Sequence, residues 1–229
     1  MVIDKGSPSV PNNGFIGRRL SAGLEFRDAV AARRSAYSLD DDIGAVGASE
    51  GSVIDALRNV IPLVPSAFNM RSVRTVVLFG DDHRRLWREV EGILRAKMEG
   101  RDFSATEAKM ASFSSAAGTI LFYEDTATVA GIAAANPRYA GNFPVWSEQG
   151  IAMAQYAAWI ALYDMGLGAN LQHYNSLIDG MVARTFGIPD GWKLVSQMVF
   201  GRIVEAPGPK ERTPGDEAVL VGHATEGPE

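Results

Sequence analysis

The chain has 229 residues, of which 46% are hydrophobic and 21% charged, an ordinary composition for one globular domain. Its formal net charge of −5 argues against a broad nucleic-acid-binding surface, so any anion site must be local. The lack of cysteine excludes disulfides, thiolate nucleophiles and thiolate metal sites. His83, His173 and His223 show no metal-ligand spacing, so no metal is expected.

The N-terminal segment, residues 1–22, is expected to form a loose arm, because it lacks the apolar run of a signal peptide. The longest uncharged apolar stretch, residues 149–163, falls short of the ~20 residues that a membrane-spanning helix needs. These features predict a soluble, cytoplasmic protein with no membrane or nucleic-acid partner.

Apolar periodicity predicts the elements of the first half of the chain. A helix is expected over residues 24–36, and a second follows Ser52 as N-cap and ends at Pro62. Residues 73–79 form a short run rich in β-branched side chains, which indicates a buried strand. Asp82 is then expected to cap an amphipathic helix.

The second half begins with an apolar strand over residues 118–123. The helix over residues 147–165 is apolar almost all round, which predicts burial on every side, at a core centre or a subunit interface. A short segment, a helix and a final strand are predicted over residues 169–171, 177–186 and 192–204.

Residues 205–229 carry four of the eleven prolines, so they are expected to form an extended tail that packs on a partner subunit rather than a helix or central strand. Helices and strands are interleaved without regular βαβ units. The pattern therefore predicts a single α+β domain over residues 23–204, between the arm and the tail.

Four clusters bring arginine, amide and hydroxyl groups to the ends of the predicted elements, where side chains often meet ligands. They are Arg33-Arg34-Ser35, residues 65–74, residues 166–175 and Lys210-Glu211-Arg212. Two guanidinium groups and a hydroxyl can hold a phosphate, with about 1.5–3 kcal/mol for each charge-assisted bond. Each cluster also has a structural alternative. The arginines can offset the negative charge at a helix C-terminus, the polar side chains of the two loops can bond to the backbone of their own turns, and the charged residues of the tail can remain in water.

Taken together and in order, these motifs resemble the FMN-dependent nitroreductase superfamily. Arg-Arg-Ser follows the first helix, Pro-Ser-x-x-Asn precedes the first strand, Gly-Leu-Gly follows the long helix, and Lys-x-Arg lies in the proline-rich tail. Asn-Phe-Pro-x-Trp-Ser-Glu-Gln (142–149), Gly-Ala-Asn-Leu-Gln-His-Tyr-Asn (168–175) and Gln-Met-Val-Phe-Gly (197–201) are similar to the branch of yeast nitroreductase-like proteins and small bacterial relatives. The resemblance covers about residues 26–221.

The resemblance implies a fold and a set of partners. The expected nitroreductase-like fold has a central, mainly antiparallel sheet flanked by helices, a long buried central helix, and a C-terminal tail exchanged in a homodimer. The expected cofactor is FMN, with NAD(P)H as reductant and a nitroaromatic or related electron-poor small molecule as acceptor.

Cofactor-binding residues follow from the same resemblance. It implies that Arg33, Arg34 and Ser35 bind the phosphate and ribityl chain, closed over by Lys210 and Arg212. It implies that one loop reaches the flavin of the other subunit, through Pro65, Ser66, Asn69 and Arg71. It also implies that a second segment lines the ring system, through Leu171, Gln172 and His173.

Two positions depart from the commoner pattern. Tyr37 stands where many members have a cation, and Arg71 replaces a glutamine. The hypothesis is that Arg71 or Arg74 supplies the positive charge beside the N1/C2=O edge of the reduced flavin.

The aromatic side chains Phe113, Tyr123, Phe143 and Trp146 are candidates for the substrate pocket wall, since aromatic faces suit flat acceptors, with core packing as the alternative. A lone histidine in a loop, such as His173, more often has a hydrogen-bonded structural role than one in proton delivery, so it is not assigned as catalytic.

The resemblance implies ping-pong hydride transfer through flavin N5 with no catalytic side chain. No G-x-G-x-x-G motif follows a predicted strand, which argues against a Rossmann dehydrogenase. Two alternatives stay open. One is a flavin-binding, redox-responsive protein with little turnover, and the other is enone or quinone reduction, dehalogenation or dehydrogenation by the same fold.

Overall fold

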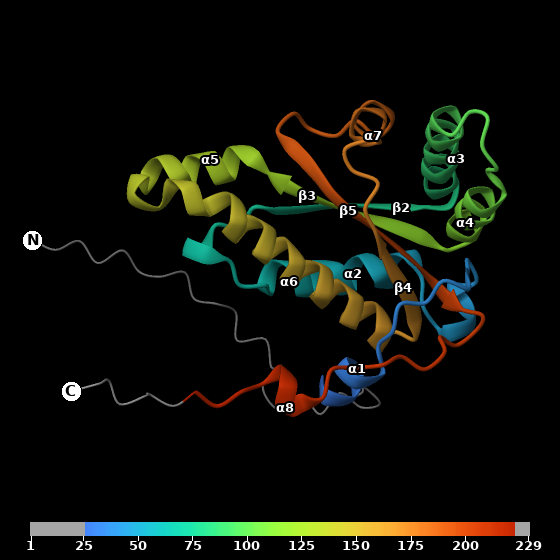
Figure 1. The fold of residues 1–229 in the computed structure, drawn as a ribbon, viewed down its shortest axis with the longest axis horizontal. Coiled ribbons are helices and arrows are strands. Elements are labelled where there is room, and N and C mark those ends of the chain that lie inside the picture. The colour runs from blue at the N-terminus through green and yellow to red at the C-terminus, as the bar shows by residue number, and fades with distance from the viewer. Residues whose placement is uncertain (1–25, 223–229) are drawn as a thin grey trace, which may run out of the picture.

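The structure, a computed structural model, describes residues 26–222. The predicted arm, the first two residues of the first predicted helix and His223 lie outside this range. The described chain folds into an open five-stranded sheet with helices on both faces (Figure 1). The predicted α+β class, with an antiparallel sheet flanked by helices, is confirmed.

Eight α-helices and five strands are assigned within residues 26–222. The helices are α1 (Phe26–Ala32), α2 (Glu50–Val60), α3 (Gly80–Lys97), α4 (Ser104–Ser114), α5 (Thr126–Ala135), α6 (Phe143–Asp164), α7 (Asp179–Phe186) and α8 (Gly215–Ala218). The strands are β1 (Leu39–Asp40), β2 (Val73–Phe79), β3 (Gly118–Asp125), β4 (Leu167–Gln172) and β5 (Trp192–Ile203).

Strand β5 is the centre of the sheet. It pairs with β1, β3 and β4, whereas β2 pairs with β3, and every one of these pairings is antiparallel. The close approach of β1 to β5 requires a glycine at Gly201, because a Cβ there would lie 2.3 Å from the carbonyl oxygen of Asp40. The pairing of β1 with β5 holds the segment that follows α1 against the sheet.

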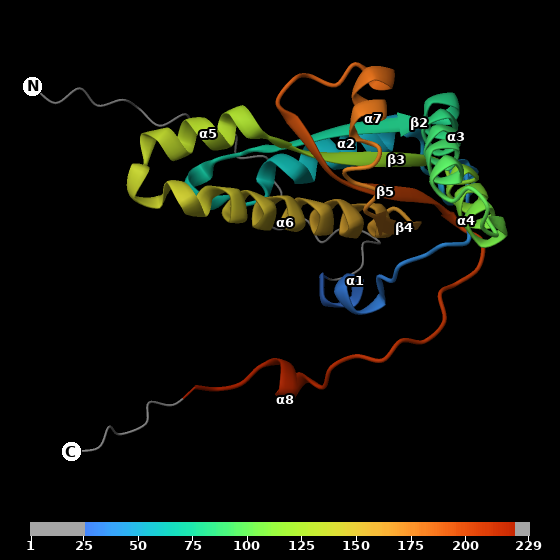
Figure 2. The same ribbon diagram turned by 45° about the horizontal axis from the view of Figure 1, so that its top comes forward.

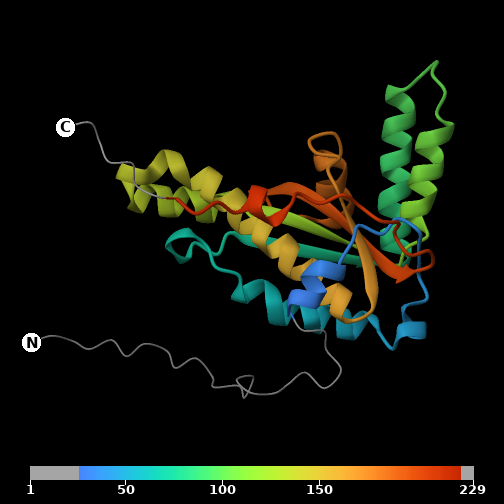
Figure 3. The same cartoon turned by 60° about the horizontal axis from the view of Figure 1, so that its bottom comes forward.

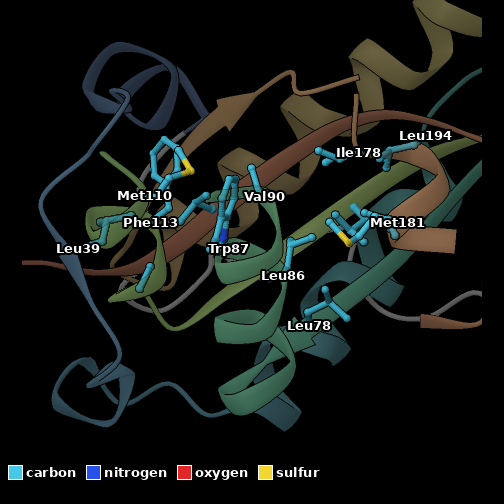
Figure 4. Close-up of a cluster of buried hydrophobic side chains, with 14 of the residues drawn as sticks. Leu39, Leu78, Leu86, Trp87, Val90, Met110, Phe113, Ile178, Met181 and Leu194 are labelled. Carbon is cyan, nitrogen blue, oxygen red and sulfur yellow. The ribbon is translucent and has the colours of Figure 1, made fainter. Parts of the chain in front are cut away.

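The two faces of the sheet carry separate hydrophobic clusters, because side chains alternate along β3. Leu121 and Tyr123 point into the cluster beneath α3, α4 and α7, whereas Ile120 and Phe122 point toward α2 and α6. In the first cluster the rings of Trp87 and Phe113 lie 4.7 Å apart, centroid to centroid (Figure 4). Figure 3 shows α3 and α4 as a pair at the end of the sheet opposite α5.

Several predicted helix ends are wrong. The first helix ends at Ala32, four residues early, and leaves Arg33-Arg34-Ser35 in the following segment. The N-cap of α2 is Ser49 rather than Ser52, which is the third residue of a reciprocal capping box. Helix α3 begins at Gly80, so Asp82 lies in its first turn and does not cap it.

Other corrections concern whole elements. Helix α6 begins at Phe143, four residues before the predicted start, with a proline in its first turn, where the missing N–H breaks no bond. Helices α4 and α5 were not predicted. The tail, expected to hold no helix, contains the single turn α8, which stands away from the sheet in Figure 2.

Helix α6 is buried on one side only within this chain. Ile151, Ala158 and Leu162 have no exposed surface, but Met153 is 41% exposed and Tyr156 is 39% exposed. Burial on every side, as predicted, is therefore not reached in the single chain. Across residues 26–222, none of the helices combines the length and the apolar character needed to span a membrane.

Candidate functional site

A cationic cavity, called the cradle below, lies where the segment after α1 meets the tail. It has a volume of about 500 Å³ and holds four cations against the single carboxylate of Glu211. Its lining residues are Val30, Arg33, Arg34, Ser35, Tyr37, Lys210, Glu211, Arg212 and Thr213. The guanidinium of Arg212 donates to the carbonyl of Ala31 at the end of α1, which brings the tail to the cradle. The first and fourth predicted clusters therefore meet.

Arg33 is the most unusual member of the cradle. Its guanidinium carbon lies 4.5 Å from the ring centroid of Trp159 on α6. Its Nε and Nη1 atoms are buried and have no hydrogen-bond partner among the described residues, and the same holds for Nε1 of Trp159. Buried guanidinium donors that lack an acceptor are costly, so this arrangement fits an anionic ligand.

Strand β4 is fixed to the cradle by amide hydrogen bonds. Ser35 forms a bridge with Ala169, and the side-chain amide of Asn170 donates to the carbonyl of Ala36 at 2.8 Å. Gln172 donates to the Asn170 side chain, also at 2.8 Å. The residues that come next in the chain after Asn170 are Leu171, Gln172 and His173, and the His173 side chain is exposed.

The loop before β2 is held in a strained conformation. Phe68, Asn69 and Arg71 have φ values of 54°, 52° and 52°, in the left-handed region that costs non-glycine residues of order 1–3 kcal/mol each. The hydroxyl of Ser66 accepts a hydrogen bond from the backbone N–H of Arg71 at 2.9 Å and closes the loop. Pro65 is exposed at its start. Such strain often occurs at functional sites, where the surroundings maintain it.

This loop carries Phe68 into a group of aromatic rings, which we call the aromatic platform: Phe68, Tyr139, Phe143 and Trp146. The rings of Phe68 and Trp146 are stacked, with centroids 5.9 Å apart and an interplanar angle of 16°. Tyr139 lies 5.8 Å from Phe68, and the fully buried Phe143 supports the group from below. Phe68 is 52% exposed, so the platform offers an aromatic face to a ligand.

The cradle and the aromatic platform lie at opposite ends of α6. Trp159 touches the cradle near the C-terminal end of this helix, whereas Phe143 and Trp146 form the platform at its N-terminal end. With 22 residues, α6 is about 33 Å long. Figure 1 shows α1 at one end of α6 and α5 at the other. One chain therefore does not bring the two groups of predicted residues together.

An apolar groove of about 1000 Å³ runs along the exposed side of α6, between α1 and α2. Leu63 is 81% exposed there, beside the half-exposed Met153 and Tyr156. Among soluble proteins, an apolar surface of this kind commonly marks an interaction site.

Two of the predicted pocket residues lie elsewhere. Phe113 and Tyr123 are buried in the core cluster beneath α3 and α7, so neither lines an open pocket in the described chain. Burial raises the pKa of the Tyr123 phenol, whose hydroxyl has no partner among the described residues. The prediction for these two residues is corrected to core packing.

Arg74 is engaged in the structure. Its guanidinium pairs with Asp125 at 2.7 Å and also donates to the carbonyls of Arg71 and Val73. The pKa of Asp125 is lowered, since hydrogen bonds from Thr128 and the charge of Arg74 outweigh the effect of burial. The Arg71 side chain is exposed, so it is the better placed of the two hypothesised cations.

Sequence reasoning missed three residues at the site. The apolar pattern of α6 indicates only packing for Trp159, and no sequence pattern joins Phe68 and Tyr139 to Trp146 as ring partners. A cation–π pair joins residues far apart in the chain, so no local spacing signals it. Within residues 26–222, no group of three or more histidine or acidic side chains is arranged to hold a metal ion.

The chain combines an open antiparallel sheet, helices on both faces, the cradle and the aromatic platform, and its sequence matches a known protein family. The chain belongs to the Nitroreductase family, whose sequence profile matches residues 30–202.

Particular relatives support this assignment. The chain is 30% identical over 203 residues to the candidate nitroreductase HBN1 of Saccharomyces cerevisiae, over 88% of this chain and 100% of that protein. It is 39% identical to the nitroreductase CinD of Lactococcus lactis, with a TM-score of 0.80, over 87% of this chain and 100% of that one. CinD has been solved with nicotinic acid, chloramphenicol and 4-nitrophenol.

A more distant structure shares the fold. The nitroreductase-like protein from Exiguobacterium sibiricum, solved in complex with FMN, is 16% identical with a TM-score of 0.63, over 88% of this chain and 99% of that one.

Proposed function

We propose that this protein is an FMN-dependent NAD(P)H oxidoreductase that reduces nitroaromatic or related electron-poor acceptors as a homodimer. The observation that carries the proposal is Arg33, which lies within a cradle of four cations and whose buried Nε and Nη1 atoms have no hydrogen-bond partner among the described residues. An acidic chain with a formal net charge of −5 gathers these cations from two segments far apart in sequence. A dianionic phosphate would offset most of the excess positive charge of the cradle.

The residues present fit FMN. Arg33, Arg34 and Ser35 would hold the phosphate, with Lys210 and Arg212 above it, because guanidinium groups bind phosphate through paired donors. Tyr37 lines the same cavity. When bound, FMN would supply the hydride chemistry that no side chain of this protein offers.

The ring system would lie along β4 beyond the cradle. Leu171, Gln172 and His173 would contact it, and the hydrogen bonds from Asn170 to Ala36 and from Gln172 to Asn170 would hold this strand at a fixed distance from the phosphate groups. His173 is exposed at the end of this segment.

The separation of the two halves of the site supports the proposal of a homodimer. Along α6, Trp159 at the cradle lies roughly 20–24 Å from Trp146 and Phe143 at the aromatic platform. If two chains pair in antiparallel fashion along the apolar groove, the platform of one chain reaches the cradle of the other. Pro65, Ser66, Asn69 and Arg71 would then approach the partner's flavin, and the tail would pack across the dimer.

The aromatic platform suggests the class of acceptor. Phe68 and Trp146 present stacked rings to the surface, and such faces favour flat, electron-poor molecules. The aromatic ligands found in CinD support this reading by similarity. Phe143 would support the platform from beneath and Trp146 would contact the acceptor. Arg71 would place a positive charge near the flavin ring edge.

The experiment begins with the cofactor. Protein is purified, any bound cofactor is released and identified by mass spectrometry, and apoprotein is titrated with FMN. We expect one FMN per chain. Replacement of Arg34 by glutamine should weaken FMN binding about 10- to 150-fold, the equivalent of about 1.5–3 kcal/mol for a charge-assisted contact. Arg85→Gln is the matched control, because Arg85 pairs with Glu89 on the surface of α3.

Turnover is then measured without oxygen, as oxidation of NADH or NADPH that depends on 4-nitrobenzoate. We expect steady oxidation with the wild-type protein. A protein that fails to take up FMN would overturn the whole proposal. A yellow protein that binds FMN but shows no acceptor-dependent oxidation would instead favour the flavin-binding, redox-responsive alternative.

A further inference from the structure

We propose that Trp159 is a positioning residue for the cofactor phosphate: its indole ring holds the Arg33 guanidinium at the cradle, so that the site prefers a flavin with a phosphate over one without. This inference rests on the proposed function, since it concerns the FMN site. It adds a residue on α6 to the groups that follow α1 and lie in the tail.

The geometry of the pair is that of a cation–π contact. The guanidinium carbon of Arg33 lies 4.5 Å from the Trp159 ring centroid, within the roughly 6 Å range of this interaction. Tryptophan has the most favourable ring face for a cation, and the attraction grows when the pair is shielded from water. Here Nε and Nη1 of Arg33 are buried, so the pair is largely desolvated.

The ring is what fixes the arginine. Nε and Nη1 of Arg33 make no hydrogen bond to any described residue, so those two donors do not hold the side chain. An unrestrained arginine side chain has many rotamers, and binding of an anion would otherwise have to offset the entropy lost in fixing one of them. Stacking on Trp159 removes part of that cost before the ligand arrives.

Trp159 is itself well supported. It packs against the cluster between α6 and the sheet, which includes Ile120 and Met198. The pair therefore connects α6 to the segment that follows α1 at the cradle. Because, among the described residues, a ring face alone compensates the charge at the buried donors of Arg33, a phosphate gains more from this pocket than a neutral hydroxyl does.

The test compares two flavins that differ by the phosphate alone. Dissociation constants of apoprotein for FMN and for riboflavin are measured by flavin fluorescence, with wild type and the variants Trp159→Leu and Trp159→Phe. We expect Trp159→Leu to weaken FMN binding about 2- to 30-fold, as loss of a cation–π contact of about 0.5–2 kcal/mol requires, and to leave riboflavin binding unchanged. Phenylalanine should restore part of the FMN affinity.

Two further variants separate positioning from packing. Tyr163→Leu removes another aromatic ring of α6 and should leave the ratio of the two dissociation constants unchanged. In an Arg33→Gln background, Trp159→Leu should no longer change FMN affinity, because the cation on which the ring acts is absent. This double-mutant cycle remains informative if Trp159→Leu lowers stability.

The outcomes are distinct. Equal weakening of FMN and riboflavin binding by Trp159→Leu, or no change in either, overturns the inference while flavin binding stands. A wild-type protein that binds both flavins equally well also overturns it. If the wild-type protein binds neither flavin, the proposed function itself is overturned.

Discussion

His83 is a fully buried imidazole that the core accommodates in its neutral form. Its Nε2 lies 3.0 Å from the carbonyl oxygen of Phe113, which can only accept, so Nε2 carries the proton. Its Nδ1 then accepts from the hydroxyl of Thr119 at 2.9 Å, and the same hydroxyl oxygen accepts from Trp87 at 3.0 Å. Burial lowers the pKa of His83 from 6.5 to about 4.

This histidine should make the protein sensitive to acid. The folded pKa lies below the unfolded value, so its contribution to stability is complete above pH 6.5 and is lost as the pH falls toward 4. The total loss corresponds to about 3 kcal/mol of unfolding free energy. Urea denaturation of wild type and His83→Gln at pH 7, 5.5 and 4.5 measures it.

The variant His83→Gln should lose less stability than wild type between pH 7 and 4.5. His173→Gln, a change at an exposed histidine, serves as the control and should follow the wild-type profile. Identical pH profiles for wild type and His83→Gln would contradict the assignment.

At the residue scale, the sequence reached part of the candidate site. Motif order pointed to Arg33, Arg34, Lys210 and Arg212, and the structure places all four around one cavity; their contact with FMN stays a prediction. Phe113 and Tyr123 could not be placed in this way, because residue type alone does not tell which side of a sheet or helix meets the core. The ring contact of Trp159 depends on tertiary packing and has no local signature.

At the scale of single elements, α2 shows how a cap sets a helix start. Ser49 accepts a hydrogen bond from the backbone N–H of Ser52 at 3.1 Å, and the Ser52 hydroxyl accepts from the N–H of Ser49 at 2.8 Å. Two donors that the helix leaves free are thereby satisfied. Two serines three residues apart make the choice of N-cap ambiguous in sequence.

Removal of the outer serine should destabilise the protein. We expect Ser49→Ala to lower the unfolding free energy by about 1 kcal/mol, because an N-cap hydrogen bond is lost. Urea denaturation at neutral pH measures this change. Ser112→Ala, inside α4, is the matched control and should be neutral or slightly stabilising, since alanine favours helix. A loss as large for Ser112→Ala would count against the capping argument.

Helices α4 and α5 illustrate where pattern reading fails. Alanine fits every side of a helix, so α5, with five alanines in its ten residues besides Val129 and Ile132, has no apolar stripe to recognise. Its start was nonetheless marked, since Asp125 accepts a hydrogen bond from the N–H of Thr128 at 3.1 Å. The strongly patterned elements β2, β3 and β5 were predicted within a few residues.

At the scale of the whole molecule, composition and irregular alternation were sufficient to predict the α+β class. Strand order was not predictable in the same way, because the pairing of β5 with three other strands depends on contacts between distant parts of the chain. The division of the site between the two ends of α6 likewise emerges only in three dimensions.

The proposed dimer can be broken at the apolar groove. Met153→Glu places a charge on the exposed side of α6, where Met153 lines the groove and is 41% exposed. We expect this variant to become monomeric and to lose FMN, because burial of an unpaired carboxylate is costly. Light scattering after size-exclusion chromatography measures the mass. The control is Ala108→Glu on exposed α4, which should leave a dimer; a dimeric, FMN-loaded Met153→Glu protein would contradict the arrangement.

The place of β5 in the sheet also bears on biosynthesis. Strands β1, β3 and β4 all bond to a strand that the ribosome produces after the other four. Before Trp192–Ile203 has been made, β2 and β3 can pair, but β1 and β4 lack the strand they bond to. Closure of the sheet then pairs Leu39 with Ile203 and closes a long loop of chain between them. The conformational entropy lost in closing this loop slows folding. A growing polypeptide of this kind exposes its future interior for most of its synthesis and completes its architecture late.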